Sequence, residues 1–236
     1  MRIDKFLSEM GIATRKEAAS AAKRGGVLVN GEMEKDTARH IDPSRDEVVF
    51  LGRRICYQKF RYIMLNKPEG YVSATEDGRD PTVLELLPAE YSKFKLFPCG
   101  RLDKNTFGLM LITDDGELSH KLLSPKKHVK KKYYFHSKFS LSGEDKESLE
   151  AGITLDDGYE TKPCEIELTG DGDEGYITLT EGKYHQIKRM LDAVHNKITY
   201  LERVEVGPLT LDVNLKRGEW RELTEEEISA LKDAAK

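Results

Sequence analysis

The segment GRLDKNTFGLMLITDDG, residues 100–116, carries the carboxylate that is best placed to do chemistry. Asp103 stands in a polar turn after Gly100 and comes just before the apolar run Leu109–Thr113. A buried strand can hold such a carboxylate rigidly in front of a substrate. An aspartate in a turn is more often a simple turn residue, so this position needs support from other segments.

A lysine-rich segment is the second feature with chemical meaning. Residues 118–138 hold seven lysines and no acidic residue, and the lysines lead directly into Tyr133, Tyr134 and Phe135. Cations beside aromatic rings suit a polyanion such as RNA, because phosphates bind the cations and bases stack on the rings. The alternative for a charge run is a solvated loop. The lysines of this run that we expect to contact RNA are Lys130, Lys131 and Lys132.

The composition is that of a globular protein and excludes several other classes. The chain has 236 residues and a formal net charge of −4, yet residues 144–181 alone hold thirteen acids and two lysines. No apolar run approaches the ~18 residues of a membrane helix, and the N-terminal segment lacks the apolar core of a signal peptide. The three cysteines have no metal-ligand spacing. We therefore expect reduced thiols in a cytoplasmic protein, with no metal site and no disulfide framework.

The N-terminal part predicts two short helices followed by strands. An apolar pattern at helical spacing covers residues 3–10. Thr14, with Glu17 three positions later, forms a capping box for a second helix. VLVNG, residues 27–31, predicts a strand that enters an Asn-Gly turn, and another short strand is expected at Glu47–Leu51.

This arrangement resembles the S4 RNA-binding module, in which a basic second helix and a following VxVNG strand lie against structured RNA. The resemblance implies an S4 domain over residues 1–58, followed by a catalytic domain over 59–236. The charged, turn-prone stretch around Arg53–Phe60 is the expected linker. A small α/β domain whose basic residues merely face solvent is the alternative. By the resemblance, the residues that would face RNA are Arg15, Lys16, Lys23 and Arg24.

After residue 60, predicted strands outnumber predicted helices. Strands are expected at Leu109–Thr113, Tyr133–Ser140 and Tyr200–Val206, and a helix is expected over Gly182–His195. The acidic segment 144–181 contains several glycines and is expected to form strands joined by tight turns. This pattern favours the α+β class, with a largely antiparallel mixed sheet in the larger domain.

Four segments carry short, specific motifs in a fixed order. They are LNKPEGYVSA (65–74), the Asp103 segment (100–116), KKHVKKKYYF (126–135) and EGKYHQIKRMLDAVHNKITYLERVEVGPLTLD (181–212). The Asp103 segment has the form GRLDxxTxGLxLxTxDG, and the first segment contains NKPxG. In form and order they resemble the motifs of the RsuA/RluB/RluE/RluF group of pseudouridine synthases, and the resemblance extends over essentially the whole chain.

This resemblance implies isomerisation of uridine to pseudouridine in RNA by an enzyme without metal or organic cofactor. Asp103 would be the catalytic carboxylate needed to break the N-glycosidic bond, either by attacking the sugar or by abstracting a proton. Tyr133 would stack on the target base, and Lys188 would pair with Asp103 and hold it ionised and oriented. The target base would be flipped out of the RNA helix. Arg101 and His185 would contact the RNA.

Two segments in the C-terminal part of the chain indicate which RNA is the substrate. YHQIKRM (184–190) and RGEWRELTEEE (217–227) are most similar to the member that acts on the small ribosomal subunit. The resemblance thus implies a target in 16S rRNA, at its uridine 516, within a partly assembled small-subunit ribonucleoprotein. The alternatives are a 23S rRNA enzyme of the same group and a non-catalytic S4-type assembly factor. We expect a monomer.

Overall fold

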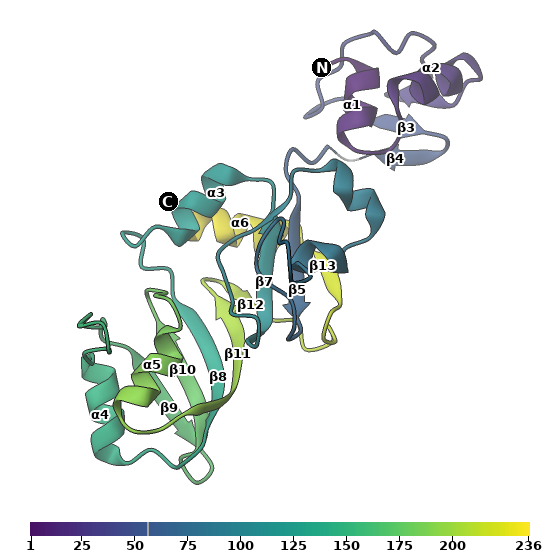
Figure 1. Cartoon of the computed structure of the whole chain (residues 1–236). Helices are drawn as coiled ribbons and strands as arrows, with labels where there is room; N and C mark the ends of the chain where they lie inside the picture. Colours follow the sequence, from purple (N-terminus) through teal and green to yellow (C-terminus); the bar gives the residue numbers. More distant parts are fainter. Residues whose placement is uncertain (56) are drawn as a thin grey trace. The chain divides into compact units, whose positions relative to one another are not determined.

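The computed structural model describes residues 1–55 and 57–236 (Figure 1). The chain divides into two compact units, Met1–Phe60 and Arg61–Lys236, each with its own hydrophobic core. Cys56 lies outside the described residues, whereas Cys99 and Cys164 are free thiols. No helix in the described part of the chain is long and apolar enough to cross a lipid bilayer.

The first unit combines two helices with a four-stranded antiparallel sheet. The strand order is β2-β1-β3-β4. Apolar residues of both helices and of the strands share one core. The elements are α1 (Ile3–Glu9), α2 (Arg15–Lys23), β1 (Val27–Val29), β2 (Glu32–Met33), β3 (Val48–Phe50) and β4 (Arg53–Ile55).

Local signals explain most of this unit. The predicted capping box is confirmed, since Thr14 Oγ1 accepts from Glu17 N at 3.2 Å and Glu17 Oε2 accepts from Thr14 N at 2.8 Å. Asn30 and Gly31, with φ of 53° and 82°, make the two-residue turn between β1 and β2. The predicted linker is wrong in its first part, because Arg53–Ile55 forms the fourth strand of the sheet.

The second unit is built on a nine-stranded sheet. Its strands are β5 (Tyr62–Lys67), β6 (Phe97–Pro98), β7 (Phe107–Thr113), β8 (Lys131–Ser137), β9 (Glu165–Thr169), β10 (Glu174–Leu179), β11 (Ile198–Val206), β12 (Leu209–Thr210) and β13 (Trp220–Glu222). Its α-helices are α3 (Gly116–Leu123), α4 (Gly143–Ala151), α5 (Gln186–Ala193) and α6 (Glu225–Ala234). Two short 3-10 helices, η1 (Val83–Leu86) and η2 (Ala89–Lys93), lie between β5 and β6.

The strand order confirms the predicted α+β class with a largely antiparallel mixed sheet. The order is β13-β5-β7-β11-β8-β10-β9, with β6 beside β7 and β12 beside β11. Among these strands only β7 and β11 pair in parallel. Helix α5 packs against β11 and α4 against β9 (Figure 1). The inward side chains of these elements form the main core of the unit.

Two predictions in this unit need correction. The helix expected over Gly182–His195 begins only at Gln186, and the residues before it form a loop. The cause is His185, whose left-handed backbone (φ 49°) does not continue a right-handed helix. The acidic segment also contains a helix, α4, because Ser142 and Asp145 form a capping box there.

Candidate active site

The carboxylate of Asp103 is ion-paired with a lysine of α5. Asp103 lies in the loop of residues 100–106, which precedes β7 and is named here the Asp103 loop. Lys188 Nζ is 2.6 Å from Asp103 Oδ2 and donates to Asn105 Oδ1 at 2.6 Å. The Asp103 side chain is 26% exposed, so the carboxylate is both held and open to solvent. The fold thus brings together two groups that are 85 residues apart in the sequence.

The segment LNKPEGYVSA (65–74), which begins in β5, holds the Asp103 loop in place. Ser73 Oγ donates to Leu102 O at 2.9 Å and accepts from Leu102 N at 3.0 Å. Gly70 N donates to Lys104 O at 2.9 Å. Because these bonds flank Asp103 on both sides, they fix the backbone and hence the direction of its side chain.

Lys67, the last residue of β5, is a fully buried lysine that binds the same loop. Its ammonium donates to the backbone oxygens of Pro68 (2.9 Å), Lys104 (3.2 Å) and Thr106 (2.9 Å). Burial lowers the pKa of Lys67 to about 8, although the charge of Asp103 acts in the opposite direction. Lys67 was not among the predicted site residues. Its signal in the sequence is a lysine at the end of a strand whose first four residues are hydrophobic, YIMLNK.

Replacing Lys67 by methionine should change how stability depends on pH. An unfolded lysine has a pKa of about 10.4. Since the folded value is about 8, the unfolded state binds more protons between these values, and stability rises with pH there. From about pH 7.5 to about pH 9.5, wild type should gain about 2 kcal/mol of unfolding free energy relative to Lys67→Met. Urea unfolding at both pH values measures this, and a pH-independent difference would contradict the lowered pKa.

Gly108 allows the two parallel strands to approach each other beside the Asp103 loop. Its φ is 100°, and a Cβ there would lie 2.3 Å from Arg203 O and 2.8 Å from Arg203 N. Any side chain would therefore push β11 away from β7. The last glycine of the GRLDxxTxG motif is therefore needed for structure, because it lets β7, the strand that follows the carboxylate, pack closely against β11.

Tyr133 lies on β8, an inner strand of the sheet between β11 and β10. It is aligned with Arg203 of β11 and with Ile177 of β10, and it is only 8% exposed. Strand β11 separates it from β7, at whose start the Asp103 loop ends. Within the described residues, the Tyr133 hydroxyl makes no hydrogen bond. The ring is thus fixed by the core while its hydroxyl keeps no protein partner.

His185 stands at the start of α5, next to the second oxygen of the carboxylate. Its Nε2 is 3.5 Å from Asp103 Oδ1, whereas Lys188 holds Oδ2. As the residue before α5, His185 is kept in this place by the helix start and by its left-handed backbone. The residue predicted to contact RNA is therefore a direct neighbour of the carboxylate.

The lysines before Tyr133 face acidic residues across the sheet. Lys130 Nζ lies 2.7 Å from Glu165 Oε1. Lys132 Nζ lies 3.4 Å from Glu167 Oε1. Lys131 is half-buried and donates to a backbone oxygen of its own segment at 2.9 Å. The basic and acidic segments thus partly neutralise each other, because β8 and β9 are separated only by β10.

Five of the residues predicted to contact RNA are exposed and carry unpaired charges. Four of them, named here the α2 cations, belong to the first unit: Arg15, Lys16, Lys23 and Arg24. The fifth, Arg101, belongs to the Asp103 loop. Among the described residues, none of these five side chains forms a hydrogen bond or an ion pair. They are therefore free to bind phosphates.

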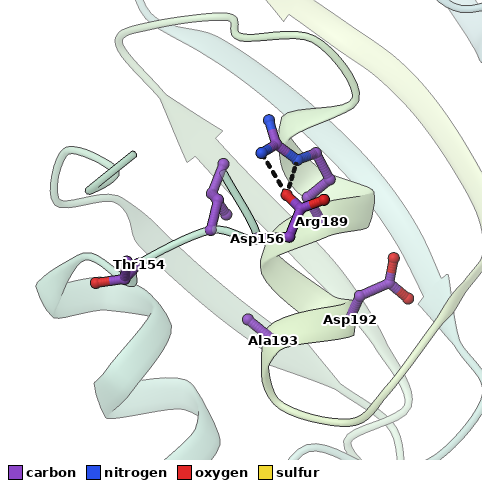
Figure 2. A pocket seen from close by; sticks show the side chains of 6 residues that line it. Thr154, Asp156, Arg189, Asp192 and Ala193 are labelled. Carbon is purple, nitrogen blue, oxygen red and sulfur yellow. Dashed lines mark hydrogen bonds and ion pairs between the residues drawn. The ribbon is translucent and has the colours of Figure 1, made fainter. Parts of the chain in front are cut away.

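A hollow of about 350 Å³ lies beside α5 (Figure 2). Arg189 Nε donates to Asp156 Oδ1 at 2.6 Å, and Arg189 Nη2 lies 2.7 Å from Asp157 Oδ2. The hollow is lined by Thr154, Leu155, Asp156, Arg189, Asp192 and Ala193. Neither Asp103 nor Lys188 lines it, so it is separate from the site around the carboxylate. Within the described residues, no three His, Cys, Asp or Glu side chains are grouped to hold a metal ion.

Relatives that match this chain over nearly its whole length are named as pseudouridine synthases. The uncharacterized RNA pseudouridine synthase YtzG of Bacillus subtilis is 48% identical over 236 residues, which cover 99% of each chain. Ribosomal small subunit pseudouridine synthase A of Vibrio vulnificus is 42% identical over 98% of this chain and 99% of its own. A crystal structure of a pseudouridylate synthase superposes with a TM-score of 0.69 at 36% identity, covering 98% of this chain and 99% of that one.

Both parts of the chain also match protein-family models. The S4 domain matches residues 1–48, and RNA pseudouridylate synthase matches residues 61–193. The second match contains the Asp103 loop, Tyr133 and Lys188. From these matches and from the identity to full-length relatives, the chain belongs to the RNA pseudouridylate synthase family and carries an N-terminal S4 domain.

Proposed function

We propose that this enzyme isomerises one uridine of the small-subunit (16S) rRNA to pseudouridine. The observation that carries the proposal is the direct contact of Asp103 with Lys188, at 2.6 Å, in a loop that has the form of the family's catalytic motif. Relatives named ribosomal small subunit pseudouridine synthase A, 42% and 39% identical over 98% of this chain, support the small subunit as the target.

The reaction exchanges one bond of the uracil for another. The N1–C1′ bond breaks, the uracil turns, and C5 bonds to C1′. The proton leaves C5 and N1 gains one, so the product is an isomer of the substrate. Asp103 acts at the sugar as a nucleophile or as a base, and both roles need an ionised carboxylate. Because Lys188 holds Oδ2, Oδ1 is the oxygen that meets the substrate.

The other side chains of the site bind and orient the RNA. A uridine inside an RNA helix does not reach Asp103, so it is flipped out of the stack. Tyr133 stacks on the flipped base. Arg101 and His185 contact the RNA beside it, one from the Asp103 loop and the other from the start of α5.

The two domains divide binding and chemistry between them. Residues 1–58 form the S4 domain, whose α2 cations bind phosphates of structured rRNA. Residues 59–236 form the catalytic domain. The enzyme acts as a cytoplasmic monomer on a partly assembled small-subunit ribonucleoprotein, at uridine 516 of the 16S rRNA. The exposed, unpaired state of the α2 cations supports this division.

Removing the charge of the α2 cations should flatten the salt dependence of RNA binding. Each phosphate contact contributes a slope of about −0.7 to −0.9 to log affinity against log salt. Replacing all four by glutamine should therefore reduce the slope by roughly 3. The matched control replaces Lys130 and Lys132 by glutamine, and its slope should change little because Glu165 and Glu167 already pair with them. Equal flattening by both variants would assign the lysine run to phosphate binding as well.

Pseudouridine mapping in a strain that lacks the gene tests the choice of RNA. One pseudouridine should disappear from 16S rRNA, and the 23S rRNA should be unchanged. A pseudouridine lost only from 23S rRNA would move the activity to the large subunit. Complementation with the wild-type gene should restore the missing site.

A further inference from the structure

Two stacked aromatic rings stand beside the carboxylate, and the outer ring is open to solvent. Tyr184 is 72% exposed. Its ring lies on the ring of His185, with centroids 3.8 Å apart and planes inclined by 18°. The edge of the inner ring reaches the site, since His185 Nε2 is 3.5 Å from Asp103 Oδ1. One face of Tyr184 is thus covered by His185, and its exposure leaves the other face free.

The loop that carries the two rings is fixed at both ends. Lys183 N donates to Gln186 Oε1 at 2.9 Å, and Gln186 Nε2 donates to Glu181 Oε1 at 2.6 Å. Arg189 Nη1 reaches Tyr184 O at 3.5 Å, and Asp156 anchors the same guanidinium, as Figure 2 shows. The backbone of this loop is therefore held in place before any ligand arrives, which lowers the entropy lost on binding.

The backbone at the inner ring is in an unusual conformation. His185 has φ 49° and ψ 31°, a left-handed geometry that is unfavourable for a residue with a Cβ. Such conformations collect at binding and catalytic sites, where the surrounding contacts maintain them. Here the conformation ends the loop, starts α5, and places the edge of the imidazole beside Asp103. The exposed ring of Tyr184 and the strained backbone of His185 together indicate a binding site for a planar group.

We propose that Tyr184 and His185 form a stacking platform for one base of the substrate RNA, the nucleotide next to the target uridine. This inference rests on the proposed function. The outer ring is one stacking step away from the residue that touches Asp103, where the flipped uridine must arrive. When the uridine leaves the stack, its neighbour loses one stacking partner, and the open face of Tyr184 replaces it. Because every base has a π-face, the platform recognises the geometry of the RNA rather than its sequence.

Three variants separate stacking from other roles of the side chain. Tyr184→Phe keeps the aromatic face and should bind RNA like wild type. Tyr184→Leu keeps an apolar side chain but loses that face, and it should weaken RNA binding about 10-fold. The control is Phe139→Leu, which removes another exposed aromatic (57% exposed) in the same unit and should have no effect. Since Tyr184 and Phe139 are both largely exposed, the fold of all three variants is preserved. A Tyr184→Phe variant as weak as Tyr184→Leu would overturn the proposal.

An RNA without the neighbouring base gives the decisive test. Abasic nucleotides are placed in turn on the 5′ and the 3′ side of the target uridine, and RNA affinity is measured for wild type and Tyr184→Leu. At one of the two positions the 10-fold difference between the proteins should vanish, because the base that stacks on Tyr184 is gone. A difference that persists at both positions would overturn the platform.

Failure of the platform and failure of the proposed function can be told apart by first measuring turnover of intact rRNA by wild type. The abasic test is then run on the rRNA that wild type modifies. If wild type modifies 16S or 23S rRNA but shows no coupling to either neighbour, the platform alone is overturned. If it modifies neither, the proposed function is overturned and the platform with it.

Discussion

Replacing Asp103 by asparagine should abolish pseudouridine formation while RNA binding survives. The amide has the size of the carboxylate, and its oxygen still accepts the hydrogen bond from Lys188. It carries no charge, however, and neither attacks a sugar carbon nor takes a proton at neutral pH. We expect turnover to fall at least about 10⁴-fold. Release of tritium from RNA with C5-tritiated uridine measures the loss, because the C5 proton leaves in the reaction.

The binding of RNA by the same variant is its control. The affinity should stay within about threefold of wild type, because phosphate contacts elsewhere supply most of it. Normal turnover by Asp103→Asn would remove this residue from the mechanism. If removal of residues 1–50 then abolished function in cells while Asp103→Asn did not, the non-catalytic assembly factor would be the better account.

Replacing Lys188 by methionine should have the second largest effect. Methionine has a similar length but no charge, so Asp103 Oδ2 loses the ammonium that lies 2.6 Å away. The carboxylate would then be free to rotate and would lack its stabilising cation. Loss of one such electrostatic partner typically lowers kcat by about 10²- to 10³-fold. Single-turnover tritium release at saturating enzyme measures the step directly.

Two further variants separate the charge of Lys188 from its role in holding the loop. Lys188→Arg keeps a cation next to Asp103 and should retain activity within about tenfold of wild type. Asn105→Ala removes the second bond of the Lys188 ammonium and leaves the ion pair. It should lower activity by less than about tenfold. If Asn105→Ala were as damaging as Lys188→Met, loop anchoring rather than charge would explain the effect.

Elements with short-range signals were predictable from the sequence. The capping box of Thr14 and the Asn-Gly turn after β1 each depend on residues that are at most three positions apart. The start of α5 was not predictable in this way. Nothing in the residue type of His185 shows that its backbone is left-handed, so the predicted helix began four residues too early. That loop also carries Tyr184 and His185, the two residues of the proposed stacking platform.

Contacts between distant segments were predictable only through the family resemblance. Asp103 and Lys188 are 85 residues apart, and no spacing rule brings them together. The charge pattern shows the same limit, because Lys130 and Glu165 pair across the intervening strand β10. A count of charges along the chain does not reveal which strands are neighbours. Lys67 was missed for a similar reason, since the three carbonyls that it binds include two from the Asp103 loop.

The central claim is that this chain converts uridine to pseudouridine in the RNA of the small subunit. Tritium release from 16S RNA with C5-tritiated uridine tests it most directly, with free RNA and with RNA bound by early-assembling ribosomal proteins. Wild type should release about one equivalent of tritium per RNA, as a single flipped uridine requires, and Asp103→Asn should release none. No release by wild type from either form of the RNA would contradict the account.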